Sequence, residues 1–285
     1  MANDVYQIIT DQILAKLESG TIPWRKPWSS VKASGGTRPR NLEGRCYSGS
    51  NWFLLGMLDY QNPVFGTYKM IQAAGGQVRK GEKGIPVVYW KMLDCKDEKE
   101  PTKVKKVPML RYYMVFNVEQ CDGLNLPEPE PMAPFDPIQD AEAIWNRYQN
   151  RPSLKHGGDR ACYIPALDSI RLPEPGTFID PASYYNTLFH EMGHSTGHES
   201  RLNRELSQVQ EKYSREELIA ELSAAFLSAQ CGLDSTLDQS AAYIASWLGF
   251  LKSDPKAFVL AAGKAQKAAD RILGITKAES AIEAA

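Results

Sequence analysis

The sequence predicts an α+β fold in two domains, and three observations support this expectation. Apolar residues recur at helical spacing in both halves of the 285-residue chain. Short segments rich in β-branched and aromatic residues lie between these helical stretches. A proline-rich stretch within residues 126–137 separates a basic half from an acidic half. We therefore expect an N-terminal α+β domain over residues 1–125, a linker, and a mostly helical C-terminal domain with a small sheet over residues 138–285.

The N-terminal half combines helices with one hairpin. The expected helices are residues 4–18, 48–60 and 67–74, and the expected strands are residues 85–92 and 107–118. The first helix carries its isoleucines and leucines on one side and ends at Gly20. The paired glycines Gly75 and Gly76 stop the third helix. Residues 94–106 are charged, so we expect them to form a solvated arm between the two strands.

Charge differs between the two halves although the whole chain is nearly neutral. Residues 1–125 hold 18 lysines and arginines against 12 aspartates and glutamates, whereas the remainder holds 15 against 22. The prolines between them are typical of an extended, semi-rigid linker. Opposite charges on either side of a linker indicate two domains with different partners. A uniformly acidic mimic of DNA is excluded, because such a protein needs negative charge throughout.

In the C-terminal half, residues that favour helix starts are the main evidence for the predicted helices. The expected helices are residues 138–150, 181–196, 214 onward, 240–252 and 255–273, and the expected strands are residues 161–164 and 169–172. Asp180 is a suitable N-cap and is followed by Pro181, the residue preferred at the first helical position. Ser214 and Glu217 have the spacing of a capping box, which predicts a further helix start.

Three of the four histidines lie within nine residues, at His190, His194 and His198. The first two belong to the motif His190-Glu191-Met192-Gly193-His194, a match expected by chance roughly 0.004 times in a chain of this composition. Helical spacing of four puts both imidazoles on one face, where they can bind one Zn²⁺ or another divalent ion such as Mn²⁺. Glu191 lies beside that position and can act as general base toward a water molecule. The motif therefore predicts a zincin-type metallopeptidase.

The third metal ligand has three candidates. His198 continues the same face, but Gly197 is expected to end the helix before it. Glu217 is the preferred candidate, because glutamate zincins take their third ligand from a second helix downstream of the motif. Glu221 follows one turn later and is expected to accept a hydrogen bond from a ligating histidine, although the two glutamates could exchange these roles. The alternative for Glu217 is a capping-box contact with Ser214 at a solvated helix start.

Several segments resemble the ArdC-type antirestriction proteins of conjugative plasmids. Residues 189–204 (FHEMGHSTGHESRLNR) resemble the metallopeptidase domain of that family, and residues 216–227 (EELIAELSAAFL) match its second-helix motif. Residues 22–28 (IPWRKPW) and 75–84 (GGQVRKGEKG) resemble its single-stranded-DNA-binding domain, which also begins some plasmid-transferred primases. The resemblance covers nearly the whole chain. It implies an N-terminal domain that binds single-stranded DNA, a C-terminal zincin related to the SprT-like class, and protection of incoming DNA from restriction.

The basic half also points to nucleic acid without this resemblance, because aromatic rings alternate with cations. The candidate DNA-binding residues are Trp24, Arg25, Lys26, Trp28, Arg79, Lys80 and Lys83. Base stacking combined with phosphate contact is how non-specific binders of single strands work. The alternative is that the tryptophans belong to a core and that the cations are simply solvated. No feature predicts a helix-turn-helix or a zinc finger that would enter a duplex groove.

The remaining features predict a cytoplasmic protein. Five widely spaced cysteines form no CxxC pair, so we expect reduced thiols, and we expect no membrane segment and no secretory signal. The leading hypothesis is a metallopeptidase tethered to single-stranded DNA, acting on an unnamed protein such as a restriction subunit. The rivals are a DNA-coating protein whose metal domain is structural or regulatory, and a peptidase whose basic half binds protein. The residue that would stabilise an oxyanion stays open between His156, Tyr163 and His198.

Overall fold

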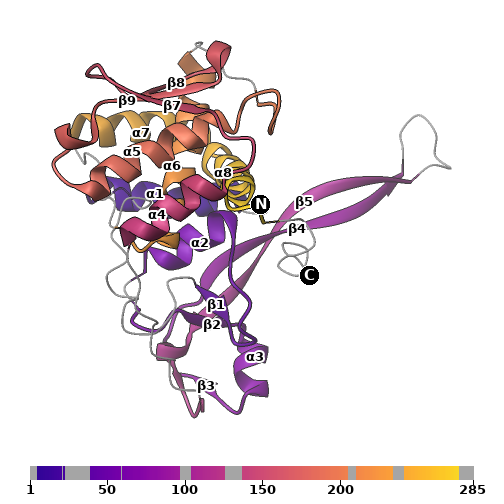
Figure 1. Ribbon diagram of the computed structural model, residues 1–285. Coiled ribbons are helices and arrows are strands. Elements are labelled where there is room, and N and C mark those ends of the chain that lie inside the picture. The colour runs from indigo at the N-terminus through magenta and orange to yellow at the C-terminus, as the bar shows by residue number, and fades with distance from the viewer. Residues whose placement is uncertain are drawn as a thin grey trace.

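The computed structural model describes residues 5–20, 22, 39–58, 60–96, 104–125, 137–204, 210–233 and 241–275. These residues form a helical body that carries a three-stranded sheet, a smaller α+β part, and a long two-stranded ribbon that projects away from both (Figure 1). The predicted α+β fold class is confirmed.

Within its described residues, the N-terminal part contains three helices and two small sheets. The helices are α1 (Val5–Glu18), α2 (Gly49–Gly56) and α3 (Tyr68–Ala73). One sheet has the order β1 (Arg40–Asn41), β2 (Val64–Gly66), β5 (Val104–Asn117), β4 (Ile85–Lys96), and the other pairs β3 (Gln77–Val78) with β6 (Cys121–Asp122) after the 3-10 turn η3 (Val118–Gln120). Thr67 caps α3 by accepting a hydrogen bond from the Met70 amide. The first and last residues of all three helices lie within four residues of the predicted ones.

The hairpin of β4 and β5 is longer than the sequence predicts. Its ladder runs from the pair Ile85 and Val115 out to the pair Lys96 and Val104. Residues 94–96 and 104–106 therefore belong to the strands, and the prediction of a solvated arm over residues 94–106 is wrong at both of its ends. Backbone pairing does not require an apolar pattern, and the ladder therefore continues through charged residues. The strands β1, β2, β3 and β6 were not predicted, because two or three residues are too few to show a period of two.

In the segments of the C-terminal part that the structure describes, five helices pack beneath a three-stranded sheet. The helices are α4 (Pro137–Arg147), α5 (Pro181–Ser195), α6 (Gln210–Gln230), α7 (Ala241–Ser253) and α8 (Ala257–Leu273). The sheet has the order β7 (Ser153–His156), β9 (Ser169–Leu172), β8 (Cys162–Ile164), with the short 3-10 turns η4 (Pro165–Leu167) and η5 (Pro175–Thr177) around it. β7 runs parallel to β9 and was not predicted, whereas β8 is antiparallel to it.

The predicted start of α6 is wrong. The helix begins at Gln210, so Ser214 lies a full turn inside it and cannot act as the N-cap of a capping box. The capping-box alternative for Glu217 therefore fails, and this side chain projects from the body of a helix.

One apolar core joins the first two helices to the C-terminal part. Ile9, Ile13 and Leu17 recur at helical spacing on α1, are almost fully buried, and lie in the same cluster as residues of α6, α7 and α8. From α2, the Trp52 ring centroid lies 4.8 Å from that of Phe226 on α6. The expected boundary at residues 126–137 falls almost entirely outside the described residues, so the division into domains stays a prediction.

Two further properties of the described residues bear on the predicted class. None of their helices has both the length and the apolar character needed to cross a bilayer. Cys46, Cys121, Cys162 and Cys231 are free thiols.

Candidate metal centre

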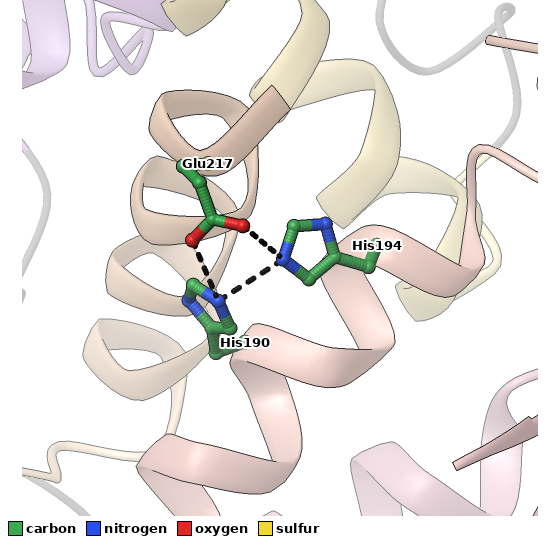
Figure 2. Close-up of side chains that lie close together, drawn as sticks. All are labelled: His190, His194 and Glu217. Atoms are coloured by element: carbon green, nitrogen blue, oxygen red, sulfur yellow. Dashed lines mark hydrogen bonds and ion pairs between the residues drawn. The ribbon is translucent and has the colours of Figure 1, made fainter. Parts of the chain in front are cut away.

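The HExxH motif lies on α5, whose start is fixed by Asp180. The Asp180 carboxylate accepts a hydrogen bond from the Ser183 amide at 2.7 Å. The helix then turns His190 and His194 to the same side, with their Nε2 atoms 3.1 Å apart (Figure 2). Both imidazoles are largely shielded from solvent, with 16% and 15% of their side-chain surface exposed.

The second helix, α6, crosses α5 closely enough to add a carboxylate. Gly193 makes this approach possible, because a Cβ atom there would lie 3.0 Å from the Ala220 Cα and 3.2 Å from the Ala220 carbonyl oxygen. At this crossing Glu217 directs one oxygen toward each imidazole (Figure 2). Its Oε2 lies 3.5 Å from Nε2 of His190, and its Oε1 lies 3.2 Å from Nε2 of His194.

These three side chains fit a divalent metal ion. Their ligand atoms all lie within 4.8 Å of one another. Ligands held about 2.0–2.1 Å from a tetrahedral zinc ion lie roughly 3.3 Å apart. The two Nε2 atoms lie 3.1 Å apart, and each has a different Glu217 oxygen near it, at 3.5 Å for His190 and 3.2 Å for His194, all close to that value. Two imidazole nitrogens and one carboxylate also match the donor set of catalytic zinc sites, which leave a position for water.

The outer nitrogens of both imidazoles face further carboxylates. Nδ1 of His190 lies 3.9 Å from Glu221, which is buried, and Nδ1 of His194 lies 3.6 Å from Glu216. A carboxylate behind a ligating histidine fixes its tautomer and ring orientation. Glu221 therefore lies on the side of His190 away from Glu217, as expected of an orienting residue rather than of the third ligand.

Glu216 is the site residue that sequence reasoning missed. Adjacent helical positions point about 100° apart, so Glu216 does not face the same imidazole nitrogens as Glu217. The His194 ring lies between α5 and α6. Glu217 therefore approaches its Nε2, whereas Glu216, which points about 100° away, approaches its Nδ1. Arg204 holds Glu216 with two hydrogen bonds of 2.6 and 3.1 Å, and also donates to the Gly193 carbonyl at 2.9 Å. Nothing in the sequence pattern signals this contact.

When no metal is bound, the carboxylates around the centre favour the protonated form of His194. Burial by itself would lower the pKa of His194, but hydrogen bonds to Glu216 and Glu217 outweigh it and raise the pKa to about 10. Burial would raise the pKa of Glu217, but hydrogen bonds from His190 and His194 hold it well below its ordinary value. A metal ion must therefore displace a proton from His194, because the ligating imidazole is neutral.

Other candidate residues of the C-terminal half lie in separate contacts. Glu191 is buried on α5 with 6% of its surface exposed. His198 lies beyond the end of α5, and its Nδ1 is 2.8 Å from the Ser200 hydroxyl. The Tyr163 hydroxyl donates to Asp168, and His156 Nε2 lies 2.9 Å from the Tyr184 hydroxyl. Among the described residues, the three-residue group able to hold a metal contains only His190, His194 and Glu217.

The predicted DNA-binding residues fall into two groups. Trp24, Arg25, Lys26 and Trp28 lie outside the described residues. Arg79, Lys80 and Lys83 are exposed, and the first two line a groove of about 820 Å³ together with Tyr68 and Phe116. Arg79 also forms ion pairs with Glu82 at 3.4 Å and Asp122 at 3.3 Å. These carboxylates partly balance its charge, whereas no such ion pair is present for Lys80 within the described part of the chain.

Comparison with known proteins agrees with this arrangement. Residues 3–116 match the sequence model of the N-terminal domain of anti-restriction factor ArdC, and residues 139–264 match the model of a zincin-like metallopeptidase. The crystal structure of Mn(II)-bound antirestriction ArdC protein from plasmid R388 is similar with 37% identity and a TM-score of 0.77, over 95% of this chain and 98% of that one. Its metal-free form is 39% identical with a TM-score of 0.76, over 94% and 96%.

Two further relatives differ in length. The uncharacterized protein y4eC of Sinorhizobium fredii is 36% identical over 94% of this chain and 91% of that protein. A DNA primase TraC of Escherichia coli is 35% identical over 94% of this chain, which spans only 20% of the primase; for a second TraC primase of that organism the identity is 34% and the share is 27%.

Proposed function

Because the chain belongs to the ArdC family of antirestriction proteins, we propose that it binds single-stranded DNA and is a metallopeptidase that protects incoming conjugative DNA from restriction. The observation that carries the catalytic part is the group formed by His190, His194 and Glu217 at the crossing of α5 and α6. Its protein substrate would be a restriction subunit or another protein that meets the entering strand in the cytoplasm.

We propose His190, His194 and Glu217 as the ligands of a Zn²⁺ ion. Imidazole nitrogen is a preferred zinc donor, and the two Nε2 atoms lie 3.1 Å apart with a Glu217 oxygen within 3.5 Å of each. The relative from plasmid R388 has an Mn(II)-bound form, so Mn²⁺ is the alternative. Either ion, when bound, polarises a carbonyl group and activates a water molecule.

The roles of the surrounding residues follow from their positions. Glu191 is proposed as the general base that takes a proton from the attacking water and later passes it to the leaving amine. Glu221 and Glu216 are proposed as positioning residues, because each carboxylate lies behind one ligating imidazole. Glu191 is not proposed as a ligand, since it projects about 100° from His190 and about 60° from His194 around the helix and does not belong to the three-residue group able to hold a metal.

We propose that single-stranded DNA binds the N-terminal half. The net positive charge of residues 1–125 supports this assignment. Arg79 and Lys80 stand exposed at one groove and Lys83 is exposed nearby in the chain, and the segment from Trp24 to Trp28 would add stacking rings. We expect Lys80 to contribute more than Arg79, because Glu82 and Asp122 already neutralise part of the Arg79 charge.

The test uses Glu191→Gln, which removes the proposed base and keeps the proposed ligands. Plasmid transfer into a restricting recipient is compared for the wild-type gene and for this variant, with metal content and single-strand affinity measured on both purified proteins. Loss of protection with unchanged metal and DNA binding is the result expected of a peptidase. Full protection by the variant would replace the peptidase with the rival function, a DNA-coating protein whose metal centre is structural or regulatory.

A further inference from the structure

The exposed apolar surface of the protein is concentrated on the ribbon of β4 and β5. Within the described residues, seven of the eleven large apolar side chains that stand exposed belong to it. They are Tyr89, Trp90, Met92, Met109, Tyr112, Tyr113 and Met114. The ribbon extends well beyond the helical body, and no other helix or strand of the described residues lies against its outer part (Figure 1). Apolar surface gathered in one place marks an interaction site.

The two faces of the ribbon differ in composition. Residues that pair across an antiparallel ladder lie on the same face, and alternate pairs share a face. The pairs Val87 with Tyr113, Tyr89 with Arg111 and Lys91 with Met109 therefore form one face. We call its exposed residues, Tyr89, Lys91, Met109, Arg111 and Tyr113, the ribbon face. Closer to the base, the same face buries Ile85, Val87 and Val115 in a small core.

Two aromatic rings form a fixed pair on the ribbon face. The ring centroids of Tyr89 and Tyr113 lie 5.6 Å apart, with their planes inclined at 57°. Because the rings are inclined rather than stacked flat, they do not cover each other, and the residues stay 44% and 37% exposed. A side-chain hydrogen bond with Tyr47 holds Tyr113 in place. The pair is therefore an ordered apolar platform open to solvent.

Positive charge surrounds this platform. Lys91 and Arg111 are the only charged residues in residues 85–92 and 108–117, which contain no aspartate or glutamate. Arg45 lies close enough to Tyr113 to oppose the rise in its pKa that burial causes. Rings bordered by three cations, with no acid among the residues of the ribbon face, are complementary to a polyanion with exposed bases. A partner protein would more often meet a mixed rim of both charges.

We propose that the ribbon face binds single-stranded DNA, with Tyr89 and Tyr113 stacking on bases and Lys91, Arg111 and Arg45 contacting phosphates. This inference rests on the proposed single-strand binding and assigns it to a surface that none of the motif residues occupies. Only bases released from a duplex can stack on the rings, so the ribbon face requires a single strand.

The experiment measures fluorescence anisotropy of a labelled mixed-sequence single strand titrated with the full-length protein. Tyr89→Ala should weaken binding by about 5- to 150-fold, the loss of one stacked base, and Tyr89→Phe should bind nearly as the wild type does. Lys91→Ala combined with Arg111→Ala should flatten the dependence of affinity on salt, since fewer counterions are released. Tyr112→Ala is the matched control, because Tyr112 is equally exposed at 45% but belongs to the opposite face.

The outcomes separate this inference from the function on which it rests. Wild-type binding that Tyr89→Ala leaves unchanged would overturn the ribbon face and keep the proposed single-strand binding. Equal losses in Tyr89→Ala and Tyr112→Ala would also overturn it, because a general disturbance of the ribbon would then explain both. Equal wild-type affinity for a duplex would contradict stacking, and absence of any binding would remove the DNA-binding function itself. Thermal melting of each variant verifies its fold.

Discussion

The side chains of the metal centre are largely shielded from solvent, whereas the aromatic side chains of the ribbon face are exposed to it. At the centre, His190, His194 and Glu217 lie where two packed helices cross, and buried carboxylates fix the imidazoles from behind. On the ribbon, Tyr89 and its neighbours stand on two strands with solvent around them. Rigid, desolvated surroundings suit an ion that needs exact distances, whereas an exposed strand pair suits a flexible chain of variable sequence. We therefore expect substitutions at the centre to have large effects on metal affinity, and substitutions on the ribbon to have smaller effects on DNA affinity.

The largest expected effect is the loss of a ligand. His194→Ala should lower metal affinity more than 100-fold, beyond the range caused by altering a residue behind a ligand. Glu191→Gln should retain the metal, because Glu191 is proposed to act on the water and not on the ion. Elemental analysis after dialysis against a graded chelator measures both. Equal loss in the two variants would show that the roles within the motif are wrongly assigned.

The second expected effect is a steep dependence of metal affinity on pH. The pKa of His194 is raised to about 10 in the metal-free protein, so this imidazole is protonated throughout the neutral range. Since metal binding must release that proton, affinity should rise about tenfold per pH unit from pH 6 to pH 8. Calorimetry in buffers of different ionisation enthalpy counts the released protons. A flat profile would mean that His194 is neutral before the ion arrives.

A third prediction concerns the carboxylates behind the imidazoles. Glu216→Gln should lower metal affinity about 10- to 100-fold, because the amide cannot hold His194 and Arg204 as the carboxylate does. Glu217→Ala should lower it further, since a ligand is lost. Arg215→Ala is the control on the same helix, because Arg215 is half exposed and pairs with Asp254. If Glu216→Gln weakened binding more than Glu217→Ala, the third ligand would have to be reassigned.

The smallest expected effect comes from the close crossing of α5 and α6. Gly193→Ala should place a methyl group against the Ala220 backbone and destabilise the protein by about 1–3 kcal/mol, with a parallel loss of metal affinity. Gly249→Ala is the control, because nothing lies within 4 Å of that position on α7. The control should be neutral or stabilising by up to about 1 kcal/mol. Chemical denaturation compares the two, and similar effects would show that the crossing tolerates a side chain.

The same contrast shows what the sequence can predict. The HExxH spacing and the signal at Asp180 and Pro181 are local, so the motif helix is found where the structure has it. The contact between Glu216 and Arg204 is not local, since it depends on how the chain returns after α5. It therefore leaves no spacing to detect.

The ribbon illustrates a second limit. Alternation of Tyr89 and Lys91 with residues of the other face is visible in the sequence, but it does not show which face stays uncovered. Its length also exceeds the apolar segments that predict it, because the ladder continues through charged residues to Lys96 and Val104. The shared core around α1 and α2 was missed for a related reason, since a helical period shows a buried face but not its partner.

Anomalous diffraction from the zinc-loaded protein, collected above and below the zinc absorption edge, would locate the ion and identify its ligands. We expect one peak per chain, about 2.0–2.2 Å from Nε2 of His190, Nε2 of His194 and one oxygen of Glu217. A peak bound by His198 or Glu221 in place of Glu217, or no peak between the two motif histidines, would contradict this expectation.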